Sequence, residues 1–189
     1  MMEVFIESTP AISEKAKSRM WTVVQVFLGS LFLAACAQVT IPLYPVPLTL
    51  QTLGVFSLAI MQGGKKASWS VLLYLAFISL GLPFLAGGTS NAMWFAIPSA
   101  GYLVAFPIAA FATGKLVSLR KKPNALWIAL SVLVGKVIVY TLGVAFLTRM
   151  LSFKESLMVG VVPFLPLAGV KLLIASTLGG VWLRWKSKS

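Results

Sequence analysis

Long apolar segments occupy most of this 189-residue chain and constrain its fold more than any other feature. A helix needs about 20 mostly apolar residues to cross a bilayer. Valine and leucine are mixed in the segments without strict alternation, which favours helices over the strands of a membrane barrel. We therefore predict an all-α, polytopic membrane protein with six transmembrane helices. The predicted spans are residues 21–41, 43–61, 67–86, 94–113, 125–147 and 159–183.

Basic residues are unevenly distributed among the loops between these spans. Twelve of the sixteen lysines and arginines precede the first span, follow the sixth, or lie in the second-to-third and fourth-to-fifth loops. The other loops hold only Arg149 and Lys154. Because positive charge favours the cytoplasmic side, both termini are predicted to be cytoplasmic in a bacterial inner membrane. The net charge of +12 then faces anionic lipid, and we expect no nucleic-acid partner.

The span boundaries also predict the domain organisation. We expect a cytoplasmic N-terminal tail at 1–20, a transmembrane domain at 21–185 and a basic C-terminal tail at 186–189. The second span is the weakest of the six, because Pro45 and Pro47 interrupt its beginning.

Acidic side chains are nearly absent from the chain. It has four glutamates, three of them before residue 15, with no aspartate and no histidine. Acid–base catalysis and metal binding depend largely on these side chains, so we predict neither an enzyme nor a cofactor site. The chain also lacks a Walker motif and carboxylates within the spans that could couple transport to an ion gradient. Active transport by this chain would therefore need an energy-supplying partner.

Two lysines lie inside predicted spans, Lys136 in the fifth and Lys171 in the sixth. A lysine near the centre of a spanning helix costs about 2.5–3.5 kcal/mol on insertion scales, so it usually faces the protein interior and has a partner. The spans contain no carboxylate to serve as that partner. Two interpretations remain: each lysine snorkels or binds backbone carbonyls, or a ligand supplies the carboxylate.

Two predicted outer loops carry side-chain amides. Residues 42–51 contain three prolines followed by Thr49 and Gln51, so a rigid, extended loop precedes a polar pair. A glutamine amide both donates and accepts, which suits a urea, lactam or amide ligand, although the pair could simply bond to nearby backbone. The second loop, 81–91, is rich in glycine and ends at Asn91.

Small residues four apart, Ser30 and Ala34, lie in the first span. This spacing allows close helix–helix approach, either within the protein or against a partner.

The proline-rich run 41–53 resembles the first-loop signature of BioY proteins, the biotin-binding S components of energy-coupling factor (ECF) transporters. Further similarities follow in the same order along the chain. They are Tyr74, Gly81-Leu82-Pro83-Phe84, Gly87-Gly88, the run 101–107, Tyr140-Thr141-Leu142-Gly143, Pro163-Phe164-Leu165-Pro166 and Lys171. The resemblance covers nearly the whole chain after residue 20.

The resemblance implies a substrate-binding domain at 21–185 that captures biotin at the outer face for uptake. Polar groups of biotin would then lie near Thr49, Gln51 and Asn91, aromatic walls would come from Tyr74 and Trp94, and Lys171 would meet a charged or polar end. The implied partners are an ECF transmembrane coupling protein and a pair of ATPases, with Ser30 and Ala34 as a possible docking surface.

Some positions depart from the family pattern. The family commonly has Pro-Gly-Asp before the lysine of the sixth span, where this chain has Pro166-Leu167-Ala168. The glycine-rich loop is altered at residues 90–91, and 97–101 read Ile-Pro-Ser-Ala-Gly. The alternatives are therefore an S component for another small vitamin-like compound, or a membrane subunit that binds no ligand.

Overall fold

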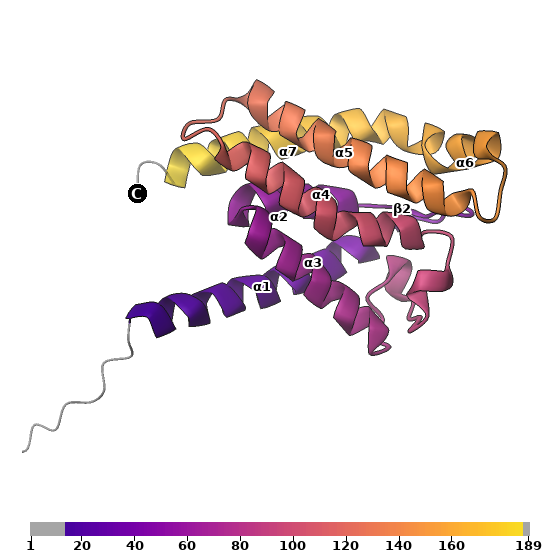
Figure 1. Cartoon of the computed structure of the whole chain (residues 1–189), viewed down its shortest axis with the longest axis horizontal. Helices are drawn as coiled ribbons and strands as arrows, with labels where there is room; N and C mark the ends of the chain where they lie inside the picture. Colours follow the sequence, from indigo (N-terminus) through magenta and orange to yellow (C-terminus); the bar gives the residue numbers. More distant parts are fainter. Residues whose placement is uncertain (1–13, 187–189) are drawn as a thin grey trace, which may run out of the picture.

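The computed structural model describes residues 14–186, apart from the side chains of residues 168, 178 and 184–186. The chain is mostly helical, as predicted, and its helices lie side by side in an elongated bundle (Figure 1). The α-helices are α1 (Glu14–Gln38), α2 (Gln51–Gln62), α3 (Gly64–Ser79), α4 (Ala100–Ser118), α5 (Ala125–Leu147), α6 (Phe153–Gly160) and α7 (Leu165–Lys186).

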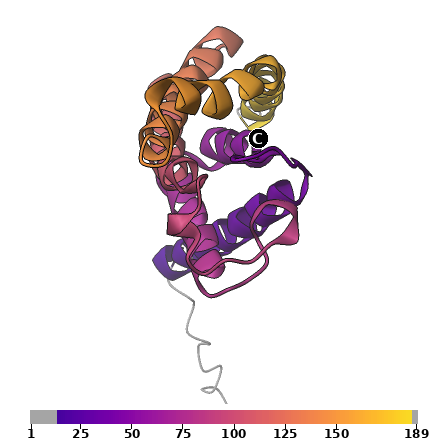
Figure 2. The same ribbon diagram turned by 90° about the vertical axis from the view of Figure 1, so that its right-hand side faces the viewer.

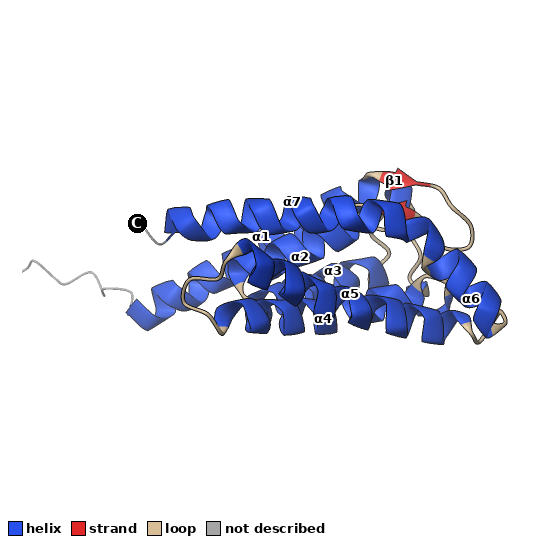
Figure 3. Cartoon of the chain, turned by 90° about the horizontal axis from the view of Figure 1, so that it is seen from above, coloured by secondary structure: helices blue, strands red, loops and turns tan. Residues whose placement is uncertain are grey.

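A small hairpin departs from the all-α prediction. Strand β1 (Thr40–Ile41) pairs antiparallel with β2 (Leu48–Thr49), and Thr40 lies opposite Thr49. The intervening residues 42–47 contain three prolines, which favour extended backbone and cannot continue a helix. The hairpin lies at one end of the bundle beside α7 (Figure 3). The described residues also form three short 3₁₀ helices, which are η1 (Ala86–Gly88), η2 (Trp94–Ala96) and η3 (Val162–Phe164).

The observed helices agree with some predicted spans and differ from others. Helix α5 has the predicted bounds, whereas α1 begins seven residues earlier and α4 six residues later. Three described helices (α1, α4 and α5) are long and apolar enough to cross a membrane. The bent segment 153–183, with a 46° break, raises the possible number to four. At 12 and 16 residues, α2 and α3 are too short for this test, so six spans stay a prediction.

Local signals explain where several helices begin. The Asn124 side chain accepts a hydrogen bond from the Trp127 backbone N–H at 2.9 Å and caps α5. The Ser152 and Glu155 side chains cap α6 reciprocally, which gives the one carboxylate after residue 14 a structural role. Pro163 and Pro166 then separate α6 from α7, because proline cannot donate the helical hydrogen bond.

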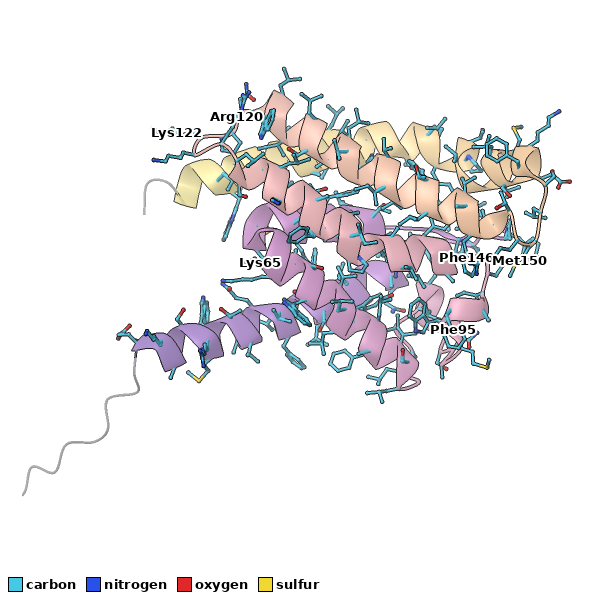
Figure 4. All side chains as sticks on the ribbon, viewed as in Figure 1. Lys65, Phe95, Arg120, Lys122, Phe146 and Met150 are labelled. Atoms are coloured by element: carbon cyan, nitrogen blue, oxygen red, sulfur yellow. The ribbon has the colours of Figure 1, made fainter. Side chains whose placement is uncertain are left out.

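The two ends of the bundle differ in the connections they carry. The first turn of α1, the α2–α3 junction, the α4–α5 loop and the last turn of α7 share one end (Figure 1). Lys65, Arg120 and Lys122 extend there, whereas Phe95, Phe146 and Met150 lie toward the opposite end (Figure 4). We call the second end, which also carries the β1–β2 hairpin, the loop end. The described parts of both predicted tails are residues 14–20 and 186; residues 1–13 and 187–189 lie outside the description.

Helices α4 and α5 form the most extensive pair in the bundle. At their loop end, a Cβ added to Gly101 would lie within 2.6 Å of the Leu142 carbonyl oxygen, so the two backbones nearly touch. At the other end α4 approaches α3 just as closely, because a Cβ on Gly64 would lie 2.5 Å from the Phe111 carbonyl oxygen. Glycine therefore permits separations that any side chain would prevent.

Candidate functional site

A cavity of about 440 Å³ lies at the loop end of the bundle. Residues from the β1–β2 hairpin, α2, the 85–99 loop, α4, α5, η3 and α7 line it. Viewed from the loop end, the hairpin and the 85–99 loop lie on one side of the α4–α5 pair, with α7 above them (Figure 2). A cavity of this size and position suits a small organic molecule.

A hydrogen-bonded polar corner forms one side of the cavity. The Thr49 hydroxyl donates to Gln51 Oε1 at 3.0 Å and also accepts from the Gln51 backbone N–H at 3.2 Å. Gln51 Nε2 donates to the Tyr74 hydroxyl, which donates to the Phe84 carbonyl oxygen at 2.8 Å. These bonds use one N–H and one lone pair of the Gln51 amide. The buried amide is thus held in place with one donor and one acceptor site left for a ligand.

Lys171 connects α7 to this corner. Its ammonium donates to the Thr49 carbonyl oxygen and, at 3.2 Å, to Thr52 Oγ1. The side chain is 9% exposed, so the ammonium lies inside the protein and does not snorkel to a surface. An ammonium has three donors, so one remains for the cavity beyond these two bonds.

Lys136 is a second cation on the cavity wall. It lies near the middle of α5, is 8% exposed, and interacts electrostatically with Lys171. No acidic side chain lines the cavity in the part of the chain that the structure describes. The sequence showed Lys136 as a cation within a span, but the prediction placed only Lys171 in the site.

Aromatic rings also line the cavity. Tyr102 stacks on Phe164 with centroids 6.3 Å apart, and Tyr140 is tilted against Phe164 at 6.5 Å. The Tyr102 hydroxyl donates to the Gly160 carbonyl oxygen at 2.8 Å, which fixes the ring between α4 and α6. These rings were not predicted as site residues, although all three lie in runs that carried the family resemblance.

The structure brings three of the six predicted site residues together, because Thr49, Gln51 and Lys171 all line the cavity. Tyr74 is not a lining residue, but its hydroxyl accepts a hydrogen bond from the Gln51 amide. Asn91 is exposed and accepts a hydrogen bond from the Met93 backbone N–H at 2.9 Å. Trp94 donates to Ser79 Oγ at 2.9 Å, also away from the cavity lining. Direct ligand contact by any of the six stays a prediction.

The proposed docking pair lies inside the protein. Ser30 is fully buried and Ala34 is 5% exposed, so in this conformation neither side chain is presented to a partner. The Ser30 hydroxyl donates to the Phe27 carbonyl oxygen at 2.7 Å. The small residues on this face of α1 let α2 and α3 pack closely against it. This is the close helix approach within the protein that the spacing of Ser30 and Ala34 allowed.

The chemistry available in this cavity is recognition. It offers a fixed amide, hydroxyls, two ammoniums and aromatic faces, which together can hold a small molecule that has both polar and apolar parts. Among the described residues, no cluster of histidine, cysteine, aspartate or glutamate could hold a metal ion. The departure at residue 168 lies outside the described side chains.

Two known proteins are similar to this chain in sequence. A biotin transporter BioY of Thermotoga maritima is 36% identical over 141 residues, which are 74% of this chain and 82% of the relative. A probable biotin transporter BioY of Pyrococcus horikoshii is 34% identical over 144 residues, covering 75% of this chain and 85% of the relative.

A solved structure has the same fold. The crystal structure of the S-component for biotin from an ECF-type ABC transporter superposes with a TM-score of 0.78 at 25% identity, covering 92% of this chain and 94% of that one. The family model described as BioY family matches residues 11–187. The resemblance seen in the sequence is thereby confirmed, and the chain belongs to the BioY family.

Proposed function

We propose that this protein is the membrane-embedded biotin-binding subunit of a biotin uptake system. The observation that carries the proposal is the cavity, which combines the fixed Gln51 amide, two lysines and an aromatic side within the fold of a biotin S-component. The protein captures biotin at the loop end with high affinity and delivers it inward.

The chemical groups of biotin match those of the cavity. Its ureido ring has donors and an acceptor that suit the amide of Gln51 and the hydroxyl of Thr49. Its thioether ring and aliphatic chain suit the aromatic faces of Tyr102 and Phe164, because burial of apolar surface favours binding. Its carboxylate suits an ammonium in a cavity that has no acidic lining among the described residues.

We also propose a six-span topology in the bacterial inner membrane, with both termini cytoplasmic and residues 21–185 as the substrate-binding domain. The tails at 1–20 and 186–189 then lie against the cytoplasmic leaflet and its anionic lipids. The grouping of Lys65, Arg120 and Lys122 at one end supports this orientation (Figure 4). Helices α2 and α3 cross only by combining with the adjoining hairpin and the 80–85 segment, because each is shorter than the bilayer core.

The uptake partners are an ECF transmembrane coupling protein and a pair of ATPases. The related structure is described as part of an ECF-type ABC transporter. The present sequence has no Walker motif, so ATP hydrolysis must occur on another chain. Docking through Ser30 and Ala34 requires α1 to move away from α2 and α3, since both side chains are buried.

Isothermal titration of the detergent-purified full chain with biotin tests the proposal. Tight one-to-one binding is expected, together with a rise in Tm, because a ligand that binds only the folded state stabilises it. Thiamine, riboflavin and pantothenate serve as matched negative ligands. Binding of one of these without biotin would assign the cavity to another vitamin, and no binding at all would favour a ligand-free subunit.

A further inference from the structure

A second hollow, which we call the lateral groove, lies along the side of the bundle and has a volume of about 510 Å³. It is lined by Phe32 of α1, by Ser57 and Met61 of α2, and by Ala175, Gly179, Val181 and Trp182 of α7. Viewed from the loop end, α2 lies between α7 and α1, so it forms the bottom of the groove (Figure 2). The groove shares no lining residue with the cavity of the candidate site.

The groove exists because α2 is short and its neighbours are small. Twelve residues of α2 rise about 18 Å, which is less than the hydrocarbon core of about 30 Å. Ala175 is 1% exposed, and a Cβ on Gly179 would meet Ile60 at 2.8 Å, so α7 packs directly on α2. Phe32 and Met61 remain 44% and 41% exposed at the sides. Within a membrane, such an apolar hollow is filled by a lipid tail or by an apolar segment of another protein.

The end of the groove near Met61 adjoins a cluster of polar side chains. Gln62, the next residue of α2, donates through Nε2 to the Gln25 carbonyl oxygen at 3.0 Å, and its Oε1 accepts from Ser70 Oγ at 3.0 Å. Lys66 Nζ donates to Gln25 Oε1 at 2.7 Å. We call Gln25 and Lys66 the basic junction. Its hydrogen bonds hold the ammonium beside the groove, where two further N–H groups can reach another acceptor.

The basic junction and the groove are aligned along α1. Gln25 and Phe32 are seven residues apart, so they lie on the same face of the helix and about 10 Å apart along its axis. The described acidic residues are distant, because Glu14 is eleven residues from Gln25, about 16 Å along α1, and Glu155 lies on α6 at the loop end. In the described part of the chain, Lys66 therefore has no carboxylate beside it.

We propose that the lateral groove binds an anionic phospholipid of the cytoplasmic leaflet, with one acyl chain along α2 and the phosphate at Lys66. The charge pattern favours this occupant over an apolar protein segment, because a phospholipid carries its negative group a short distance from an apolar chain. The phosphate forms charge-assisted hydrogen bonds with the ammonium. A zwitterionic headgroup binds less well, since it brings a second cation to the basic junction. The leaflet follows from the proposed orientation, whereas the site itself is independent of biotin and goes beyond the proposed function.

Thermal unfolding of the delipidated full chain in detergent tests the proposal, with lipids of identical acyl chains added in large excess. Phosphatidylglycerol is the anionic probe, phosphatidylcholine is the zwitterionic probe, and inorganic phosphate tests the anion alone. Phosphatidylglycerol should raise the Tm of wild type by about 5 °C, and phosphatidylcholine should raise it by less than half as much. Inorganic phosphate should leave the Tm unchanged. Native mass spectrometry should show one retained phosphatidylglycerol per chain.

Variants separate the headgroup site from the groove. Lys66→Met should reduce the phosphatidylglycerol shift to that of phosphatidylcholine and leave biotin affinity unchanged, while Lys66→Arg should keep most of the difference. Lys121→Met is the matched control, because it removes an exposed lysine of the α4–α5 loop. Ser57→Phe fills the groove and should abolish both lipid shifts. Ala35→Phe places the same ring at an exposed position of α1 and should retain them.

Several outcomes would overturn the proposal. Equal shifts by the two lipids in wild type, or a full preference for phosphatidylglycerol in Lys66→Met, would remove the headgroup site. Full shifts in Ser57→Phe would place the lipid outside the groove, and an equal shift with inorganic phosphate would replace the lipid by a free anion. No shift and no retained lipid would leave the groove to a partner protein. Biotin titration of the same preparations distinguishes each of these results from a failure of the proposed function.

Discussion

The cavity has a helical wall, formed by α4 and α5, and a loop wall, formed by the hairpin at 40–49 and the 85–99 loop. Close backbone contact at Gly101 joins the two helices of the helical wall, and the Tyr102 hydroxyl bond to Gly160 connects α4 to α6. The loop wall is held mainly by short-range bonds, such as the Gly88 N–H to the Leu85 carbonyl oxygen at 3.1 Å. The helical wall therefore sets the shape of the cavity. The loop wall covers the cavity and can rearrange without disturbing the packing of the helix bundle.

The largest expected effect comes from disturbing the helical wall. Gly101→Ala places a Cβ against the backbone of α5, where neither helix can move without breaking many other contacts. We expect a loss of about 3 kcal/mol in the free energy of unfolding, seen as a lower Tm in detergent. Gly180→Ala on α7 is the matched control, because a Cβ there meets nothing within 4 Å. An unchanged Tm in Gly101→Ala would show that this wall is not rigid.

The polar corner, where the hairpin meets α2, gives the next largest effect. Gln51→Leu removes the amide that faces the cavity and should weaken biotin binding by about 2 kcal/mol, roughly thirtyfold. Tyr74→Phe removes only the hydroxyl behind that amide and should weaken binding by a few-fold. Titration of the two variants with biotin distinguishes direct ligand contact by Gln51 from indirect support by Tyr74. Equal losses of affinity would place Tyr74 in direct contact with the ligand.

A substitution in the loop wall should change binding more than stability. Gly87 has φ of 66°, a conformation that costs a side chain about 1–2 kcal/mol. Gly87→Ala should weaken biotin binding by this amount, while the Tm of the ligand-free protein changes little, because the loop opens without unfolding the bundle. Thermal unfolding and titration of the same preparation check both parts. A fall in Tm as large as that of Gly101→Ala would show that the loop wall stabilises the bundle as much as the helical wall does.

The smallest effect concerns the bond between α7 and α2. Thr52→Val keeps the shape of the side chain and removes the hydroxyl that accepts from Lys171 at 3.2 Å. We expect about 1 kcal/mol weaker binding, close to fivefold, since the Thr49 carbonyl still accepts from the same ammonium. An unchanged affinity would assign the positioning of Lys171 to Thr49 alone.

Local patterns predicted the helical elements well where the chain carries both an apolar run and an end signal. Helix α5 agrees with its predicted bounds because Asn124 caps a continuous apolar segment. The prediction was less accurate at 43–61, where hydropathy extended a span over the proline-rich hairpin. The hairpin depends on pairing between Thr40 and Thr49, which no periodicity within either segment reveals.

The candidate site was predicted in part for a similar reason. Thr49, Gln51 and Lys171 are chemically unusual within apolar surroundings, so the sequence singles them out, and all three line the cavity. Tyr102, Tyr140 and Phe164 are ordinary residues of apolar helices until α4, α5 and η3 bring their rings together. Conversely, the spacing of Ser30 and Ala34 is the same for an internal contact and for a docking surface, and only their burial distinguishes the two.

The sequence by itself determined the helical membrane class, the grouping of positive charge and the family, because hydropathy, charge and short sequence motifs are properties of the chain read in order. The tertiary structure decided which side chains share one cavity. Lys136 and Lys171 are alike in the sequence, but packing places one on the α5 side of the cavity and the other at the junction of three segments. That difference arises from contacts between distant segments, which local patterns do not encode.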